Sequence, residues 1–251
     1  MQTVKKHGRG FPLLFTFISG FLFFIALVCL GTTLIIHCRG FYHLLAQPLK
    51  IISESGLTKE VVLRNYDHLI EYCSLFYRGS LSFPDFPSSP SALSHFAETK
   101  TLFSYLSLAV PVCFFAGVLL IALKVWGRGK RCLKSRLQIP ANLPAEFSRT
   151  LHFTARLCVI VPFACLLLFL FDFHSAFYRM HHILFDNNDW IFDAATDPII
   201  TILPERYFLC CGIGIILFLL LAAAVLSHLQ NHLSKPAPCA ARQKNVFSVH
   251  S

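Results

Sequence analysis

Histidine is the residue type whose spacing in this chain most clearly suggests chemistry. His95 is followed by Glu98 and Thr99, three and four residues later, so all three share one face if the segment is helical. A second set with steps of four and three residues follows the third apolar stretch and comprises His174, Tyr178 and His181. Imidazole titrates near neutral pH, so both sets indicate general acid–base chemistry.

The segment after the second set is dense in carboxylates, amides and further side chains that could bind a ligand. It contains His182, Asp186, Asn187, Asn188, Asp189, Trp190, Asp193 and Asp197. The residues at 186–189 can instead simply form a turn. We predict no metal site, because neither an HExxH motif nor another recognised ligand spacing is present. A serine elbow and a Gly-rich phosphate loop are also missing, which leaves histidine acid–base chemistry.

The composition indicates a membrane protein. Of the 251 residues, 55% are hydrophobic and only 14% are charged, and the net charge is +9. A soluble domain is about one quarter charged, which argues against an ordinary cytosolic enzyme. The basic residues are interleaved with long apolar stretches, so we predict no nucleic-acid partner. The ten cysteines form no CxxC pair, so neither a disulfide framework nor a zinc framework is expected.

Four apolar stretches are long enough to cross a bilayer as helices. They lie at about 11–36, 102–126, 153–173 and 207–227. The first has no small-residue cleavage pattern, so we expect it to remain as a helix. The predicted fold is an all-α polytopic membrane protein with four transmembrane helices and helical extracytoplasmic loops. We expect a single four-helix domain over residues 1–228 and a cytoplasmic tail over 229–251.

The distribution of charge predicts the orientation. The N-terminus, the connection between the second and third spans and the tail together carry 14 Lys or Arg and one acidic residue. The connections at 37–101 and 174–206, with their flanks, carry 8 basic and 12 acidic residues. The positive-inside rule therefore places both termini and the basic loop 127–152 in the cytoplasm. The histidine sets then face the extracytoplasmic side.

Both extracytoplasmic connections carry signals for helices. Apolar residues recur at helical spacing from Thr58 to Tyr77, with Thr58 as a possible N-cap. Ser89 and Pro90 are typical of a helix start. The second transmembrane helix would then begin about three turns before its apolar stretch, and His95 would lie on this additional segment. Two further helix starts are expected at Asp197-Pro198 and Leu203-Pro204.

Four clusters of residues resemble one known family. They are Asn65-Tyr66-Asp67, Ser94-His95 with Lys100, His181-x-Ile183-x-Phe185 through Trp190, and Asp197-Pro198-Ile199-Ile200 with Leu203-Pro204-Glu205. The family is that of the four-helix membrane proteins of Gram-positive bacteria that include the lipoprotein intramolecular transacylase, Lit. The resemblance covers nearly the whole chain. One departure is Glu98-Thr99-Lys100, where the family pattern is Asp-Val-Lys.

The resemblance implies an acyltransferase of the cell membrane. Its reaction moves an acyl chain from the sn-2 position of a lipoprotein's diacylglyceryl-cysteine to the α-amine of that cysteine, which gives an N-acyl lyso-lipoprotein. Exchange of an ester for an amide is downhill, so no cofactor is expected. The expected partners are diacylated lipoprotein N-termini and membrane lipid.

We hypothesise that His95 and His181 are the catalytic residues and shuttle the proton. Glu98 is expected to orient His95, and Asn65 or Tyr66 to donate a hydrogen bond to the developing oxyanion. The supporting or substrate-binding set comprises Asn65, Tyr66, Asp67, Glu98, His182, Asp189, Trp190 and Asp197.

A non-catalytic scaffold or a pH-responsive sensor is the alternative interpretation. It does not require His95 and His181 to lie near each other, whereas the enzyme hypothesis predicts that both border one cavity open to the outer leaflet. A transporter is disfavoured, because the apolar stretches hold no charged residue that would mark a pathway.

Overall fold

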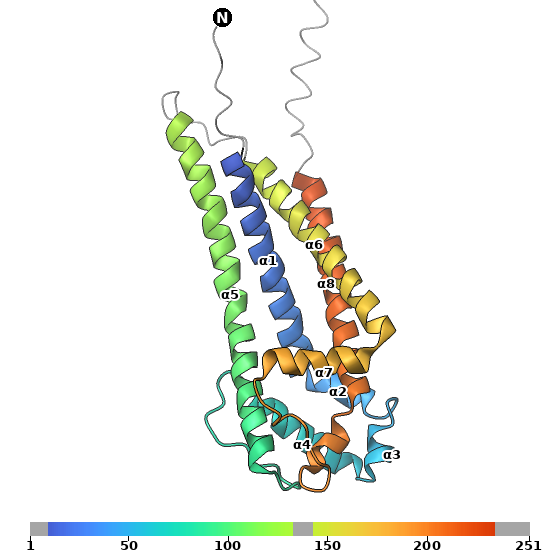
Figure 1. Cartoon of the computed structure of the whole chain (residues 1–251). Coiled ribbons are helices and arrows are strands. Elements are labelled where there is room, and N and C mark those ends of the chain that lie inside the picture. The colour runs from blue at the N-terminus through green and yellow to red at the C-terminus, as the bar shows by residue number, and fades with distance from the viewer. Residues whose placement is uncertain (1–9, 133–142, 234–251) are drawn as a thin grey trace, which may run out of the picture. The chain divides into compact units, whose positions relative to one another are not determined.

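The computed structural model describes residues 10–132 and 143–233, and all the regular structure in this part of the chain is helical (Figure 1). The side chains at 10–12, 127–132, 143–146 and 168–171 lie outside the description. The elements are α1 (Gly10–His37), α2 (Arg39–Leu45), α3 (Ile51–Ser55), α4 (Lys59–Tyr72), α5 (Pro90–Cys132), α6 (Leu143–Phe171), α7 (Phe173–Leu184), the 3-10 helix η1 (Pro198–Ile202) and α8 (Glu205–Leu233).

Four of these helices are long and apolar enough to cross a membrane, as predicted. The spans are Leu13–His37, Pro90–Trp126, Phe147–Leu167 and Glu205–Leu233. The predicted start of α5 is confirmed, because Pro90 is its first residue and the Ser89 hydroxyl accepts the N–H of Ala92 at 3.1 Å. The helix therefore begins well before the apolar stretch at 102.

Parts of the basic loop predicted at 127–152 are helical. Helix α5 continues to Cys132 and α6 already begins at Leu143, so helix extends into both ends of the loop. At the other predicted boundary, α8 runs to Leu233 and thus past 228. The remainder of the predicted tail, 234–251, falls outside the described residues.

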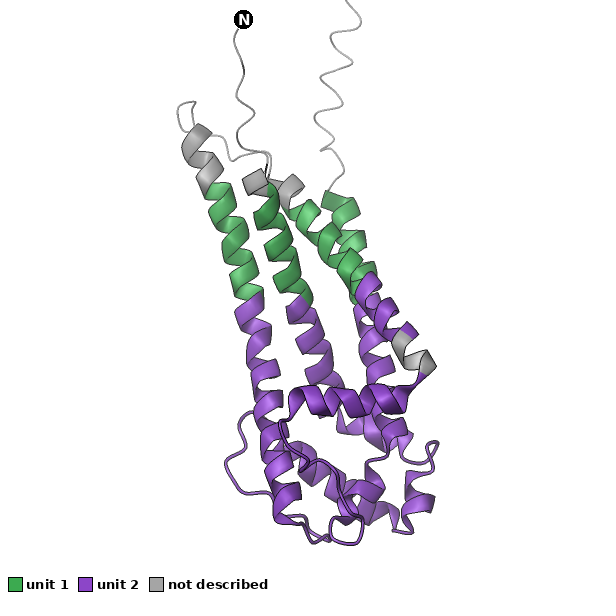
Figure 2. Cartoon of the chain, viewed as in Figure 1, with its two compact units in different colours: residues 1–24, 114–158, 221–251 green, residues 25–113, 159–220 purple. Residues whose placement is uncertain are grey.

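The chain divides into two compact units, and each boundary falls inside a long helix (Figure 2). Unit 1 comprises 1–24, 114–158 and 221–251, and unit 2 comprises 25–113 and 159–220. Unit 2 contains all the short helices and, with them, every residue of the predicted site.

Unit 1 depends on a close approach of α6 to α1 at Gly20. A Cβ atom at this position would lie 2.6 Å from the Phe153 ring, so any larger residue would require this ring to move. The backbone carbonyl of Gly20 also accepts the Thr154 hydroxyl hydrogen at 3.1 Å.

Unit 2 is built around three buried tyrosines from α2, α4 and α8. The rings of Tyr42 and Tyr66 stack with centroids 3.6 Å apart, and the hydroxyls of Tyr66 and Tyr207 are hydrogen-bonded at 2.5 Å. The Tyr42 hydroxyl donates to the carbonyl of Ile202 in η1 at 2.7 Å. Because the bonding pairs lie far apart in sequence, this cluster ties the short helices to the start of α8.

Helix α4 confirms the predicted amphipathic helix but ends earlier than expected. The Thr58 hydroxyl caps it by accepting the N–H of Val61 at 3.4 Å, and the helix stops at Tyr72 instead of Tyr77. The chain turns after Cys73, and the carbonyl of Tyr77 accepts a hydrogen bond from Lys100 on α5 at 3.1 Å. Residues 73–77, which were predicted to form the last turn of this helix, instead form a non-helical turn that contacts α5.

Candidate active site

His95 is positioned by the start of α5. The backbone N–H of Ser89 donates to the Asp197 carboxylate at 2.7 Å, which ties the helix cap to the residue before η1. His95 follows in the second turn and is 8% exposed. Its Nε2 lies 3.4 Å from the Thr99 hydroxyl, and its Nδ1 is buried without a hydrogen-bond partner in the described structure. One ring nitrogen is therefore left for a group that the chain itself does not supply.

His181 is positioned by α7, which begins at an N-cap formed by Asp172. The Asp172 carboxylate accepts the N–H of Ser175 at 3.0 Å. His181 Nδ1 lies 2.9 Å from the carbonyl of Phe177. A carbonyl only accepts, so Nδ1 carries the hydrogen and Nε2 of the neutral ring keeps its lone pair. This is the tautomer that a proton acceptor at Nε2 requires.

The surroundings of His181 favour its neutral form. The ring stacks on Trp190 with centroids 4.7 Å apart, and Phe177 packs edge-on at 4.4 Å. Burial lowers the pKa of His181 below its ordinary value, although the hydrogen bond to the Phe177 carbonyl acts in the opposite direction. His181 is thus suited to accept a proton near neutral pH.

The two histidines meet inside a group of aromatic rings. The centroids of His95 and His181 lie 6.0 Å apart. Phe185 packs edge-on against His95 at 4.6 Å and lies 5.8 Å from His181, and Phe192 lies 5.6 Å from His95. Sequence reasoning included Phe185 in a cluster that resembles the family without assigning it a role, and it missed Phe192, because one phenylalanine among 26 carries no local signal.

Asn187 organises the carboxylates beside the histidines. Its side-chain amide donates to Glu98 Oε1 at 2.9 Å, its side-chain oxygen accepts the N–H of Asp189 at 3.0 Å, and its carbonyl accepts the Trp190 indole N–H at 3.0 Å. The other Glu98 oxygen, Oε2, is buried without a partner in the described structure. Asp189 is close enough to act electrostatically on His95. Sequence reasoning left open whether Asn187 contacts a ligand or forms a turn.

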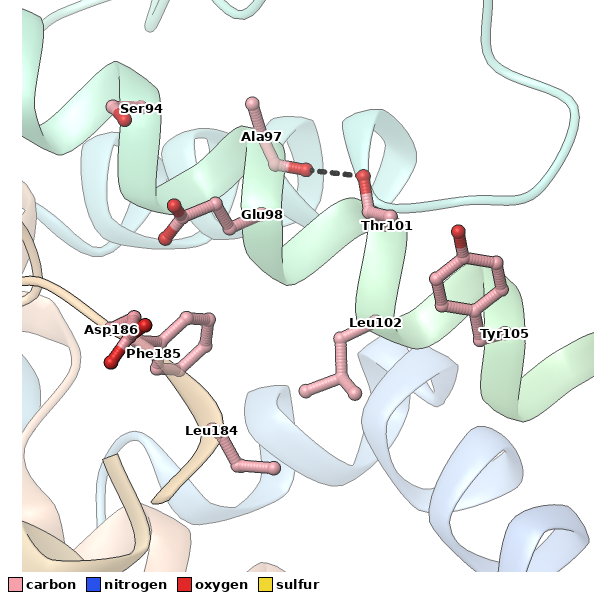
Figure 3. Close-up of a pocket in the computed structure, with 9 residues that line it drawn as sticks. All are labelled: Ser94, Ala97, Glu98, Thr101, Leu102, Tyr105, Leu184, Phe185 and Asp186. Carbon is pink, nitrogen blue, oxygen red and sulfur yellow. Dashed lines mark hydrogen bonds between the residues drawn. The ribbon is translucent and has the colours of Figure 1, made fainter. Parts of the chain in front are cut away.

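A cavity of about 510 Å³ lies next to this group. It is lined by Ser94, Ala97, Glu98, Thr101, Leu102, Tyr105, Leu184, Phe185 and Asp186. Figure 3 shows the Glu98 side chain reaching from α5 toward the segment that carries Phe185 and Asp186. The lining combines two carboxylates with apolar side chains, as a cationic amphiphile would require.

Neither histidine is among the described residues that line this cavity, which differs from the expectation that both would border one cavity. The reason is the position of Phe185, which lines the cavity and packs against the His95 ring. Glu98 lies one helical turn beyond His95 on α5, and its side chain lines the cavity.

Asn65 and Tyr66 have other partners than the expected oxyanion. The buried Asn65 amide donates to the carbonyl of Val61 at 2.8 Å and to Asp85 at 2.6 Å, and its oxygen accepts the backbone N–H of Asp85. No amide hydrogen of Asn65 is therefore left for an oxyanion in this structure. The Tyr66 hydroxyl is bonded to Tyr207 in the core.

Of the remaining predicted residues, some hold the surrounding helices in place and one packs within the aromatic group. Asp67 accepts a hydrogen bond from His43 at 2.8 Å. Asp197 is 2% exposed and holds the start of α5. His182 packs edge-on against Trp190 at 5.3 Å, the same indole on which His181 stacks. Of the predicted set, the structure thus brings Glu98, His182, Asp189 and Trp190 together with the two histidines.

Within residues 10–132 and 143–233, no group of three or more His, Cys, Asp or Glu is placed to hold a metal ion. The donors nearest the histidines already have other roles, since Glu98 is bonded to Asn187 and His181 to the carbonyl of Phe177. A reaction without a metal stays a prediction.

Comparison with known proteins gives one family. The family model of the lipoprotein intramolecular transacylase Lit matches residues 17–208. The solved structure of the membrane-integral lipoprotein intramolecular transacylase Lit from Bacillus cereus is similar, with a TM-score of 0.73 and 25% identity over 94% of this chain and 98% of that one. None of the curated proteins compared matches the chain.

Two further structures of the Bacillus cereus protein, each with one histidine replaced, are also similar. The variant with arginine and the variant with alanine both have a TM-score of 0.67 and 25% identity, over 94% of this chain and over 95% and 96% of theirs.

Proposed function

We propose that this chain, which belongs to the family of lipoprotein intramolecular transacylases, moves an acyl chain from the sn-2 oxygen of diacylglyceryl-cysteine to the α-amine of the same cysteine. The product is an N-acyl lyso-lipoprotein. The observation that carries the proposal is the pairing of His95 and His181 near the half-buried Glu98, whose Oε2 is buried without a partner. We place this site at the extracytoplasmic face of the membrane, with both termini in the cytoplasm.

The reaction needs proximity more than activation. The amine and the ester belong to one molecule, so holding them in contact replaces a bimolecular encounter by an intramolecular one. An α-amine with a pKa of about 7.7–8.0 has a useful neutral fraction at physiological pH. The amide product is more stable than the ester, so no cofactor has to supply energy.

The proton balance assigns a role to each histidine. The amine nitrogen forms a bond to the ester carbonyl carbon, and His181 Nε2 takes the proton that this nitrogen gives up. The bond between that carbon and the sn-2 oxygen then breaks, and the oxygen must receive a proton. His95 lies 6.0 Å away between ring centroids and has a buried, unpartnered Nδ1. We assign it to the leaving oxygen, with the proton shared between the two rings over the reaction.

The acidic cavity supplies the binding contacts in this proposal. Glu98 Oε2 is buried without a partner, and the substrate's α-ammonium would bind there and give one proton to this carboxylate, so that the amine is neutral when it attacks. Glu98 later releases that proton to solvent. Asp186 provides the second carboxylate. Leu102, Leu184 and Tyr105 offer apolar surface for an acyl chain, so the amine and the lipid can be held together one helical turn from His95.

The test is expression of this chain in bacteria that retain diacylated lipoproteins, followed by mass spectrometry of N-terminal lipopeptides. We expect peptides with one acyl chain on nitrogen and one on glycerol. A variant that combines His95→Ala with His181→Ala, expressed to the same level, is the matched control and should leave the peptides diacylglyceryl. Unchanged lipopeptides from well-expressed, folded wild-type protein would contradict the proposal.

A further inference from the structure

A second cavity, also of about 510 Å³, lies on the other side of the ridge formed by Thr101 and Tyr105 on α5. One wall is a stripe of α5 that changes from charged to hydroxyl to apolar along the helix, through Lys100, Ser104, Tyr105 and Leu108. The other wall is the turn after α4, which includes Phe76 and Arg78. The first cavity contains carboxylates, whereas the lining of this one contains two cations and no acidic residue.

Lys100 is held in place by this turn. Its ammonium lies 4.4 Å from the centroid of the Tyr72 ring and 4.9 Å from that of Tyr77, and it donates to the Tyr77 carbonyl at 3.1 Å. Such cation–π contacts position an ammonium without neutralising it. An ammonium has three donors, and the carbonyl takes only one. A positioned positive charge therefore faces the cavity.

The rest of the lining suits contact with lipid. Phe76 is 82% exposed, an unusual state for a phenylalanine unless another apolar phase covers it. Leu108 lies eight residues beyond Lys100, about 12 Å along the helix at 1.5 Å per residue. A phosphodiester at Lys100 would thus have glycerol beside Ser104 and an acyl chain beside Tyr105 and Leu108.

We infer that this cavity binds an anionic glycerophospholipid of the surrounding leaflet, with its phosphate between Lys100 and Arg78. The ligand is a resident membrane lipid and not the lipoprotein, because the diacylglyceryl anchor of the proposed substrate carries no phosphate. The lipid clamps the turn after α4 to α5, the helix that carries His95. The site is thus separate from the proposed reaction.

Native mass spectrometry of the full-length chain in detergent tests the inference without any turnover. Phosphatidylglycerol and phosphatidylcholine with identical acyl chains are titrated in parallel. We expect phosphatidylglycerol to bind at least fivefold more tightly, and Lys100→Gln and Arg78→Gln each to weaken it about fivefold, as expected for one cation facing an anionic lipid. Lys100→Arg should retain binding. Lys59→Gln, an exposed cation outside the cavity, should have no effect.

Three results would overturn the inference. One is equal affinity for the two lipids. Another is wild-type affinity for phosphatidylglycerol in both glutamine variants. If Lys100→Gln does not fold, wild-type affinity in the exposed Arg78→Gln is sufficient to overturn the inference. The third is displacement of the lipid by an equal concentration of inorganic phosphate, which would assign the site to a soluble anion.

Discussion

The rings of His95 and His181 lie 6.0 Å apart although they come from α5 and α7, and Phe185 packs against both. Two histidines at this separation cannot both be charged at little cost, because each lowers the proton affinity of the other. A shared proton avoids this cost, since one ring is neutral whenever the other is protonated. The pair is therefore suited to proton transfer.

Replacement of His181 by alanine is expected to lower the rate of N-acyl lyso-lipoprotein formation by about 10² to 10⁴, the usual contribution of a positioned acid or base. His68→Gln on α4 is the matched control, because it removes a half-buried histidine that has no assigned role in the site. The rates are measured by mass spectrometry of a lipopeptide substrate with purified protein. Full activity of His181→Ala would contradict the assignment even with the overall function intact.

His181 should titrate below the ordinary range of histidine. Burial lowers its pKa, so the imidazole signals that disappear in His181→Ala should show an NMR titration midpoint below pH about 6.5 in the substrate-free protein, where the substrate amine takes no part. Trp190→Leu exposes the ring and should move this midpoint upward toward that value. Trp126→Leu, in unit 1, should leave it in place. An unchanged midpoint in Trp190→Leu would mean that the indole does not cause the shift.

The sequence predicted the features that depend on neighbouring residues. The starts of α4 and α5 follow from Thr58 and from Ser89-Pro90, because capping is local chemistry. The four spans follow from apolar length. Residue type and setting also pointed to His95 and His181, whose catalytic role stays a prediction.

The contacts of amide side chains were not predictable. Asn187 bonds Glu98 on α5, and Asn65 bonds Asp85 in an irregular segment. Both partners are brought close only by the folded chain. The sequence does not show which group an asparagine will bond, so Asn187 stayed open between a ligand contact and a turn, and Asn65 or Tyr66 was expected to donate to the oxyanion.

Glu98→Gln tests whether the negative charge of Glu98 is needed for activity, with the hydrogen bond to Asn187 retained. Glutamine keeps an oxygen that can accept the hydrogen bond from Asn187, but it removes the negative charge at the unpartnered Oε2 position. Loss of a hydrogen bond to a charged group corresponds to roughly 10- to 100-fold, which we expect in kcat/KM with little change in thermal unfolding. Glu60→Gln, an exposed carboxylate at the start of α4, is the control. Wild-type kcat/KM in Glu98→Gln would exclude the ammonium site.

Asn65→Ala should loosen the segment that follows the turn after α4. It removes a fully buried amide that makes two hydrogen bonds with Asp85 and one with the Val61 carbonyl, so we expect a loss of about 1–3 kcal/mol. Arg64→Gln removes the exposed partner of the same Asp85 and should have a smaller effect. Thermal unfolding in detergent and hydrogen exchange over 80–89 measure both. The reverse order of the two effects would contradict this account.

Asp197→Ala should affect His95 through the helix that carries it. The buried Asp197 carboxylate accepts the Ser89 N–H at 2.7 Å and the Thr196 hydroxyl at 2.8 Å, and alanine would leave the helix cap without this partner. We expect a loss of about 1–3 kcal/mol and faster amide exchange in the first turn of α5, because an unpaired buried N–H is costly. Asp197→Asn keeps an oxygen for the Ser89 N–H and should lose less. Equal exchange in the first turn of both variants would show that the cap of α5 does not depend on this carboxylate.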